Sequence, residues 1–321
     1  MIINPLCLGY LDQAAETASE SVIMGSDSQI VDVATKLAVK VFGWASEPAR
    51  KFVDGRIEEF NLVGMVKAEN VAMLLDAAYD IPKGWIESTD PIKQRAGLRV
   101  LRETVREQRN IEDVVMEAIA VLSESSRPED IDDDWCANFL GHARKVADPG
   151  VRILWSRLLA GEADNPGSFS KKTVNILADM DKSTAVSFTM LCKFVCRVDG
   201  MRKLFLVPNY QQPIFGSGGL DFYTLTALQA LGLIEISAVG GFSHVSNSRY
   251  TTIEYFGSSM ILESAGEVPV GQVSFTPFGS QLATLVQPQI TPGFFDHLAV
   301  FYKQQTDISS VSISKSSGDV H

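Results

Sequence analysis

Five arginines recur in one stretch of the sequence at steps of three or four residues. They are Arg95, Arg99, Arg102, Arg106 and Arg109. Residues at this spacing share one face of an α-helix, so the pattern predicts a narrow cationic stripe. Leu98, Leu101 and Val105 form an adjacent apolar stripe. Guanidinium groups bind phosphates, acidic protein surfaces and lipid head groups. The plainer interpretation is a solvated helix face that Glu103 and Glu107 partly neutralise.

A second candidate anion site lies in the run PGSFSKKT, residues 166–173. The proline and glycine predict a turn that leads into the N-terminus of a helix, with Lys171 and Lys172 beside it. Free backbone N–H groups at such an end hold anions. The alternative, which we favour, is a capped helix whose Phe169 packs as a hydrophobic staple.

A third candidate surface is the amphipathic helix that we expect from residue 30 to residue 44. Its apolar positions include Ile30, Leu37, Val41 and Trp44. An apolar face with lysines and a terminal tryptophan is typical of helices at a membrane interface. Burial of the same face in a protein core is the more common outcome, and we favour it.

The sequence shows no pattern for metal binding or catalysis. Cys192 and Cys196 are four residues apart, which predicts two small buried side chains on one helix face. The four histidines are far apart, and neither a zinc spacing nor a nucleophile elbow occurs. Ser243 and His244 are adjacent in a stretch that we expect to be a tight turn. We therefore predict no enzyme activity, no metal and no cofactor.

Composition limits the classes of protein that fit. The chain has 321 residues, a formal net charge of −11 and 45% hydrophobic residues, as expected for a globular protein. The acidic balance opposes non-specific attraction to nucleic acid or anionic lipid. Four scattered cysteines, the lack of a long apolar run and the absence of a secretory signal favour a cytoplasmic protein.

The predicted fold class is mainly α with a C-terminal α+β part. Apolar residues recur at helical spacing before residue 200, whereas strand-like segments separated by glycines follow it. Asn110 is expected to cap a new helix, and another helix is expected from Lys182 to Val198. The predicted domains are a helical region over 1–122, a central helical domain over 130–200, a winged-helix-like module over 201–304 and a flexible tail over 305–321.

The winged-helix-like module is predicted from a helix at residues 220–231 that leads into the strand LGLIEI and a glycine-bounded β-ribbon. The helix in the position that reads DNA in such modules contains Asp221 and no lysine or arginine. Because DNA-reading helices are usually basic, this argues against DNA recognition by the module and favours a protein contact or a structural role.

Three stretches together resemble one uncharacterised bacterial family, domain-of-unknown-function family 2806. They are REQRNIEDVV (106–115) with DDDW (132–135), ILWSRLLAGEADNPGSFSKKTVNIL (153–177), and LGLIEISAVGGFSH (231–244) with VSFTPFGSQLA (273–283). The resemblance covers roughly residues 93–304, and the tryptophan–LLAGE–PGSFS run is its most specific part. It implies a cytoplasmic bacterial protein, brings no catalytic residues, and suggests a place among anti-phage defence proteins.

The leading hypothesis is a non-enzymatic sensor or adaptor that recognises a protein or a membrane-associated target and recruits an effector. The alternative is a nucleic-acid-binding protein that uses the arginine stripe, and its binding would weaken steeply with salt. A protein partner is expected, peripheral membrane contact is a further hypothesis, and self-association is left open.

Overall fold

The computed structural model describes residues 28–44, 46–54, 84–200, 202–216, 219–237, 239–246, 248–264 and 266–314. The chain divides into two compact units, Met1–Ala178 and Asp179–His321, which are called unit 1 and unit 2 below. Part of the helical region predicted over residues 1–122, including residues 55–83, lies outside the described residues. Among the helices that are described, none is long and apolar enough to cross a membrane.

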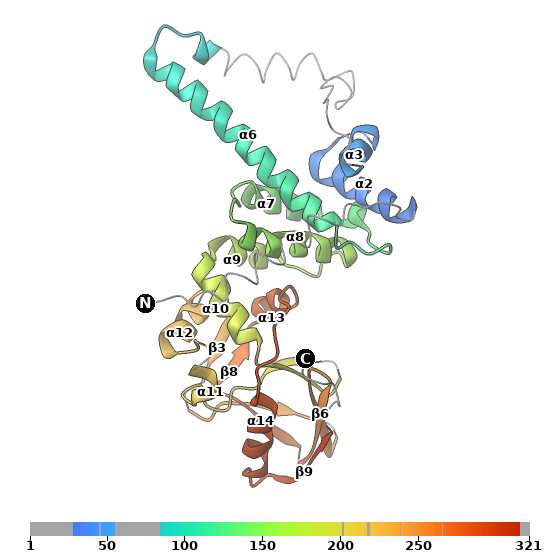
Figure 1. Ribbon diagram of the computed structural model, residues 1–321, viewed down its shortest axis with the longest axis vertical. Coiled ribbons are helices and arrows are strands. Elements are labelled where there is room, and N and C mark those ends of the chain that lie inside the picture. Colours follow the sequence, from blue (N-terminus) through green and yellow to red (C-terminus); the bar gives the residue numbers. More distant parts are fainter. Residues whose placement is uncertain are drawn as a thin grey trace. The chain divides into compact units, whose positions relative to one another are not determined.

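The described part of unit 1 is helical (Figure 1). Aspartates cap three of its helices, and each accepts a hydrogen bond from a backbone N–H in the first turn: Asp90, Asp132 and Asp148. The helices are α2 (Ser28–Phe42), α3 (Ser46–Val53), α6 (Pro91–Ile119), the 3-10 helix η1 (Pro128–Asp130), α7 (Asp133–Ala143), α8 (Pro149–Asp164) and α9 (Lys171–Asp179).

The core of unit 1 is an aromatic cluster between α7 and α8. The rings of Trp135 and Phe139 stack with centroids 5.2 Å apart, and Phe139 lies 5.3 Å from Trp155. All three side chains are at most 3% exposed. Such rings bury large apolar areas, so this cluster contributes much of the stability of unit 1.

Helix α6 is continuous, which corrects the prediction that Asn110 caps a second helix. Asn110 is buried in the middle of α6, and its side-chain amide donates to the carbonyl oxygen of Arg144 at 2.8 Å. Its side chain therefore bonds to a neighbouring segment and does not compete with the backbone of its own helix.

Unit 2 combines short helices with antiparallel strands. Its helices are α10 (Lys182–Cys192), α11 (Pro213–Gly216), α12 (Phe222–Ala230), α13 (Pro277–Ala283) and α14 (Phe294–Lys303). Its strands are β1 (Val195–Val198), β2 (Arg202–Phe205), β3 (Ile234–Ile236), β4 (Phe242–Val245), β5 (Tyr250–Tyr255), β6 (Ser258–Ser264), β7 (Glu267–Gly271), β8 (Val273–Phe275) and β9 (Ile308–Ser314).

The main sheet of unit 2 has the strand order β2-β1-β5-β6-β9, and β3 pairs with β8 and β4 with β7. Helix α14 contacts β6 and β9 (Figure 1). Its Tyr302 is fully buried and donates a hydrogen bond to the carbonyl oxygen of Pro269 at 2.9 Å. The structure is thus mainly helical with a C-terminal antiparallel sheet, as the coarse fold prediction states.

Three expected boundaries differ from the structure. The helix expected from Lys182 to Val198 ends at Cys192, because the next residues form β1 between β2 and β5. The helix α10 therefore begins unit 2, whereas the predicted central domain ran to residue 200. The tail expected from residue 305 contains β9, whose Ile308 is buried and whose backbone pairs with β6.

Strands β7 and β8 are separated by a single residue, because β7 ends at Gly271 and β8 begins at Val273. Gly271, the last residue of β7, has a φ of +119°, and a Cβ there would be 2.1 Å from the carbonyl oxygen of Val207. Only glycine fits this close approach of two backbones, so the chain turns at this residue.

Candidate functional site

The candidate site is the exposed N-terminal half of α6. Asp90 caps this helix by accepting a hydrogen bond from the backbone N–H of Ile92 at 2.8 Å, and Pro91 occupies the first helical position. Gly97 lies against Trp85 and Ile86, and a Cβ on it would be 3.1 Å from each side chain. The residues that follow are mostly arginine, leucine and glutamate, which favour helix.

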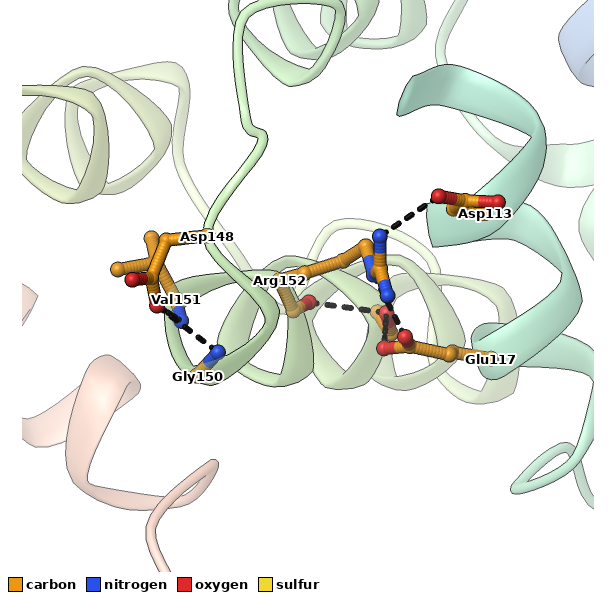
Figure 2. A network of polar contacts seen from close by, with 7 residues as sticks. Asp113, Glu117, Asp148, Gly150, Val151 and Arg152 are labelled. Atoms are coloured by element: carbon orange, nitrogen blue, oxygen red, sulfur yellow. Dashed lines mark hydrogen bonds and ion pairs between the residues drawn. The ribbon is translucent and has the colours of Figure 1, made fainter. Parts of the chain in front are cut away.

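The C-terminal half of α6 is fixed to α8 by a network around Arg152 (Figure 2). Arg152 donates to Asp113 and to Glu117, each at 2.6 Å, and Ser156 donates to Glu117 at 2.9 Å. Because Asp113 and Glu117 are four residues apart, one guanidinium reaches both carboxylates from the facing helix. The network holds α6 by one end.

The two halves of α6 present their apolar residues in different directions. The buried residues of the C-terminal half include Val114, Val115 and Ala118. At roughly 100° per residue, the stripe of Leu98, Leu101 and Val105 is centred roughly 120° from that buried face. These three side chains are 52%, 49% and 56% exposed. The stripe is therefore not a continuation of the core.

All five arginines of the predicted stripe are exposed in the structure. Arg99 pairs with Glu103 at 3.2 Å, whereas Glu107 pairs with Arg144 of the α7 C-terminus, also at 3.2 Å. Within the part of the chain that is described, Arg95, Arg102, Arg106 and Arg109 have no ion pair. Arg95, Leu98, Arg99, Arg102, Glu103 and Arg106 line a shallow hollow of about 400 Å³.

The second candidate, the PGSFS turn, is already occupied by a carboxylate of the chain itself. Glu162 is 1% exposed, and it accepts hydrogen bonds from the backbone N–H groups of Gly167 at 2.6 Å and Phe169 at 2.9 Å. Burial raises the pKa of Glu162, and these hydrogen bonds offset only part of that rise. The group that this turn binds is thus the Glu162 carboxyl of the same chain, not a separate anion.

The two lysines beside the turn do not converge on it as a pair. Lys171 lies 3.3 Å from Asp134 of α7, and Lys172 is exposed. Ser170 accepts the N–H of Thr173 and so caps α9, and Phe169 is buried against Gly161 of α8.

The apolar face of α2 packs within unit 1, which corrects its selection as a membrane-contact surface. Leu37 and Val41 are 0% and 7% exposed, Ile30 is half-buried, and Trp44 stacks on Phe42 with centroids 4.1 Å apart. Helix α2 contacts α3, η1 and α6. Leu37 and Val41 are therefore used for packing, whereas Ile30 and Trp44 are partly exposed.

The cysteines are buried but do not share a helix face, because Cys192 ends α10 and Cys196 lies in β1. Burial raises the pKa of both thiols, so they are neutral apolar side chains. Among the described residues, no group of three or more histidine, cysteine, aspartate or glutamate side chains is placed to hold a metal ion.

The adjacent Ser243 and His244 lie in β4, and the two side chains are not brought together as a nucleophile and its base. His244 is 7% exposed, and its Nε2 is 3.0 Å from Asp199, which joins β1 to β2. Asp199 also accepts the N–H of Thr252 at 2.9 Å. This cluster connects three strand segments of unit 2.

Sequence reasoning missed the partners of Glu162, Arg152 and Asp199. Each partner is distant in the chain or depends on the shape of a turn. The sequence signal that could have identified the first of these interactions is Glu162 itself, in the LLAGE–PGSFS run. A turn with free N–H groups needs an acceptor nearby.

The described residues define a two-unit protein, helical and then α+β, with an exposed cationic and apolar face on α6. A family model described as "Protein of unknown function (DUF2806)" matches residues 94–299. The chain belongs to this family, so the predicted family resemblance is confirmed. No curated protein and no solved structure matches the chain.

Proposed function

We propose that this protein is a non-enzymatic adaptor that binds an acidic protein surface through the exposed face of α6. The α6 face is defined as Arg95, Leu98, Arg99, Leu101, Arg102, Val105, Arg106 and Arg109. The observation that carries the proposal is the exposed apolar stripe, which points away from the direction of the core and borders the arginines.

The chemistry of the α6 face is that of a protein interface. Arginine beside leucine and valine supplies apolar contact together with charged hydrogen-bond donors, and arginine is enriched in such interfaces. A surface that only neutralised phosphates would gain little from Leu98, Leu101 and Val105. A matching partner presents an acidic row beside an apolar row, for example on an amphipathic helix.

Nucleic acid is the second candidate partner, and one observation favours it. The five exposed arginines follow successive helical turns, roughly 5.4 Å apart, and four lack an ion pair within the described residues. The net charge of −11 opposes this partner. Binding of a protein partner should depend on the apolar stripe, whereas binding of nucleic acid should not.

We further infer that unit 2 contains a winged-helix-like module built from α10, α11, α12 and the β3–β8 pair. This inference is supported by the order of these elements and by the antiparallel pairing of Ile234–Ile236 with Val273–Phe275. Helix α12 has no lysine or arginine, and its Phe222 and Tyr223 are 55% and 81% exposed. We propose that this helix contacts the recruited effector, not DNA.

The cellular role is proposed from the family resemblance, which favours a cytoplasmic bacterial protein of anti-phage defence. A protein or membrane-associated target would then be recognised during infection. Plaque counts on cells with and without the intact gene test this role. Equal plaque counts over a broad panel of phages would contradict the defence role, but they would not contradict the binding proposal.

The binding proposal is tested with a synthetic amphipathic peptide that carries a glutamate row beside a leucine row. We expect the triple variant R99E/R102E/R106E and the double variant L98S/V105S each to weaken binding at least about tenfold, measured by fluorescence anisotropy. Lys145, Lys172 and Lys303 are exposed on other elements, so K145E/K172E/K303E is the charge-matched control.

The same variants separate the partners. Binding of duplex DNA or single-stranded RNA that falls with the arginine changes, ignores L98S/V105S and weakens steeply with salt would favour the nucleic-acid hypothesis. A peptide that binds the control and all the α6 variants equally would contradict the role of the α6 face.

A further inference from the structure

A pocket of about 420 Å³ opens on unit 2, and the proposed function does not use it. Its wall is formed by β1, β2 and β5, by the turn between β5 and β6, and by the segment after α13. This volume is in the range of small-molecule sites, which combine apolar walls with a few placed polar groups.

One side of the pocket carries a row of charged residues across three strands. In the register of the sheet, Lys203 of β2 faces Arg197 of β1, and Arg197 faces Glu254 of β5. Arg197 and Glu254 are only loosely paired, at 3.9 Å, with side chains 57% and 43% exposed. The row therefore has two cations and one anion, with the cations at one end.

The rest of the pocket is apolar and aromatic. Tyr255 and Val286 line it, and the Phe256 ring lies against that of Tyr255 in an edge-on contact, with centroids 4.8 Å apart. Tyr255 is fixed, because its hydroxyl donates to the carbonyl oxygen of Lys193 and accepts the N–H of Thr291. Tyr255 is only 3% exposed, so it supports the ring of Phe256, which is the aromatic side chain that a ligand can reach.

Phe256 adopts a backbone conformation that its side chain disfavours. Its φ is +44°, and Gly257 follows with a φ of +81°. These two residues form the hairpin turn that joins β5 to β6. Two-residue hairpin turns with positive φ at both positions prefer asparagine or glycine at the first position. A phenylalanine here is strained, and its ring is nevertheless 48% exposed. Neither backbone preference nor burial explains this residue.

We propose that the pocket binds a small aromatic anion, whose ring packs against Phe256 while its carboxylate or sulfonate bonds to Arg197 and Lys203. The strained turn places an aromatic surface at the mouth of the pocket, and the cationic end of the row supplies the counter-charge. Glu254 repels the anion from the opposite end of the charged row, and this fixes the position of the anion near Arg197 and Lys203.

The experiment uses the full chain and a fluorescent aromatic sulfonate, 1-anilinonaphthalene-8-sulfonate, as the probe. R197Q and K203Q are expected to lower its affinity about fivefold or more, whereas E254Q is expected to raise it. The neutral analogue N-phenyl-1-naphthylamine should respond little to these three changes, because it lacks the anionic group.

The decisive variant is F256N, because its two expected effects differ in sign. Asparagine suits the turn, so the thermal midpoint of unit 2 should rise, while the affinity for the sulfonate should fall about fivefold or more. Misfolding cannot produce this combination. L98S/V105S serves as the control for probe binding on α6 and should leave the affinity unchanged.

Three outcomes would overturn the proposal. One is unchanged sulfonate affinity in F256N together with the expected stabilisation, which would make Phe256 irrelevant to binding. Another is equal sensitivity of the neutral and anionic probes to R197Q and K203Q. The third is loss of probe binding in L98S/V105S, which would place the probe on unit 1.

Discussion

The buried carboxylate of Glu162 acts as an internal acceptor for backbone amides. Glu162 accepts two N–H groups of the turn after α8, and that of Phe169 would otherwise be buried without an acceptor. A buried charge is costly unless hydrogen bonds compensate for it, and here they do so only in part, since burial still raises the pKa. The conformation of the LLAGE–PGSFS run therefore depends on one side chain.

Asp199 provides a residue-scale prediction about pH. Burial raises its pKa, but the hydrogen bond from His244 and that from the N–H of Thr252 outweigh burial, so the pKa lies below its usual value of 3.8. A carboxyl group with a lowered folded-state pKa contributes stability above its unfolded-state pKa. That contribution is lost as the pH falls through 3.8 toward the folded-state value.

We therefore expect D199N to destabilise unit 2 by about 1 kcal/mol near neutral pH and to cost progressively less below 3.8. Asparagine tolerates the positive φ of +49° at this position, so the change removes charge and preserves the turn. Urea unfolding followed by circular dichroism at several pH values measures the effect. A cost that stays constant into the acid range would show that the charge is not responsible.

At the scale of the element, α6 is a long helix that is fixed at its C-terminal half. The Arg152 network supplies the polar part of that attachment. The side chain of Arg152 is 19% exposed, and those of Asp113 and Glu117 are 42% and 27% exposed. Solvent therefore screens the pairs in part, and their contribution is smaller than that of a fully buried network.

We expect R152M to lower the free energy of unfolding of unit 1 by about 1–2 kcal/mol, because two facing carboxylates lose their partner while the apolar volume is kept. R99M is the matched control, since its ion pair is exposed and should contribute less than about 0.5 kcal/mol. All four tryptophans lie between residues 44 and 155, so tryptophan fluorescence reports on unit 1. Equal effects of the two changes would show that the network does not anchor α6.

The elements with strong local signals could be predicted from the sequence. The helical spacing of apolar residues before residue 200 and the glycine-separated strand-like segments after it indicated the helical part and the part with the sheet, and the spacing of the arginines predicted the exposed stripe. Asn110 and Val195 were misassigned because their partners are distant in the chain. A helix-capping residue and a buried core asparagine look alike locally, and a four-residue strand after a helix has too few positions to show its period.

The pairing of Asp199 with His244 and the pocket beside Phe256 could not be predicted either. His244 lies 45 residues from Asp199, and only the sheet brings the two together. The positive φ of Phe256 has no sequence signal, because phenylalanine rarely occupies such a turn. What the local sequence specifies here is the position of elements, whereas the sites depend on non-local contacts.

At the scale of the whole molecule, each unit has its own core and its own hydrogen-bonded elements. Unit 2 contains a cluster in which Phe194, Phe215 and Phe294 make edge-on contacts, with centroids 4.9 to 6.1 Å apart. Gly279 of α13 lies so close to Leu233, the residue before β3, that a Cβ would be 1.8 Å from the carbonyl oxygen of Leu233. Such close internal packing is typical of a segment that folds as a unit.

We expect a chain of residues 179–314 to fold alone and a chain of residues 179–305 to fold poorly. The longer chain retains β9, which pairs with β6 from Ser264 to Ser259 and buries Ile308 against unit 2. The shorter chain exposes the backbone edge of β6 and loses the contact between β9 and α14, so it should melt at least about 10 °C lower or aggregate. Far-UV circular dichroism and size-exclusion chromatography compare the two chains. Equal melting temperatures would mean that β9 adds nothing to unit 2, as expected of a tail from residue 305.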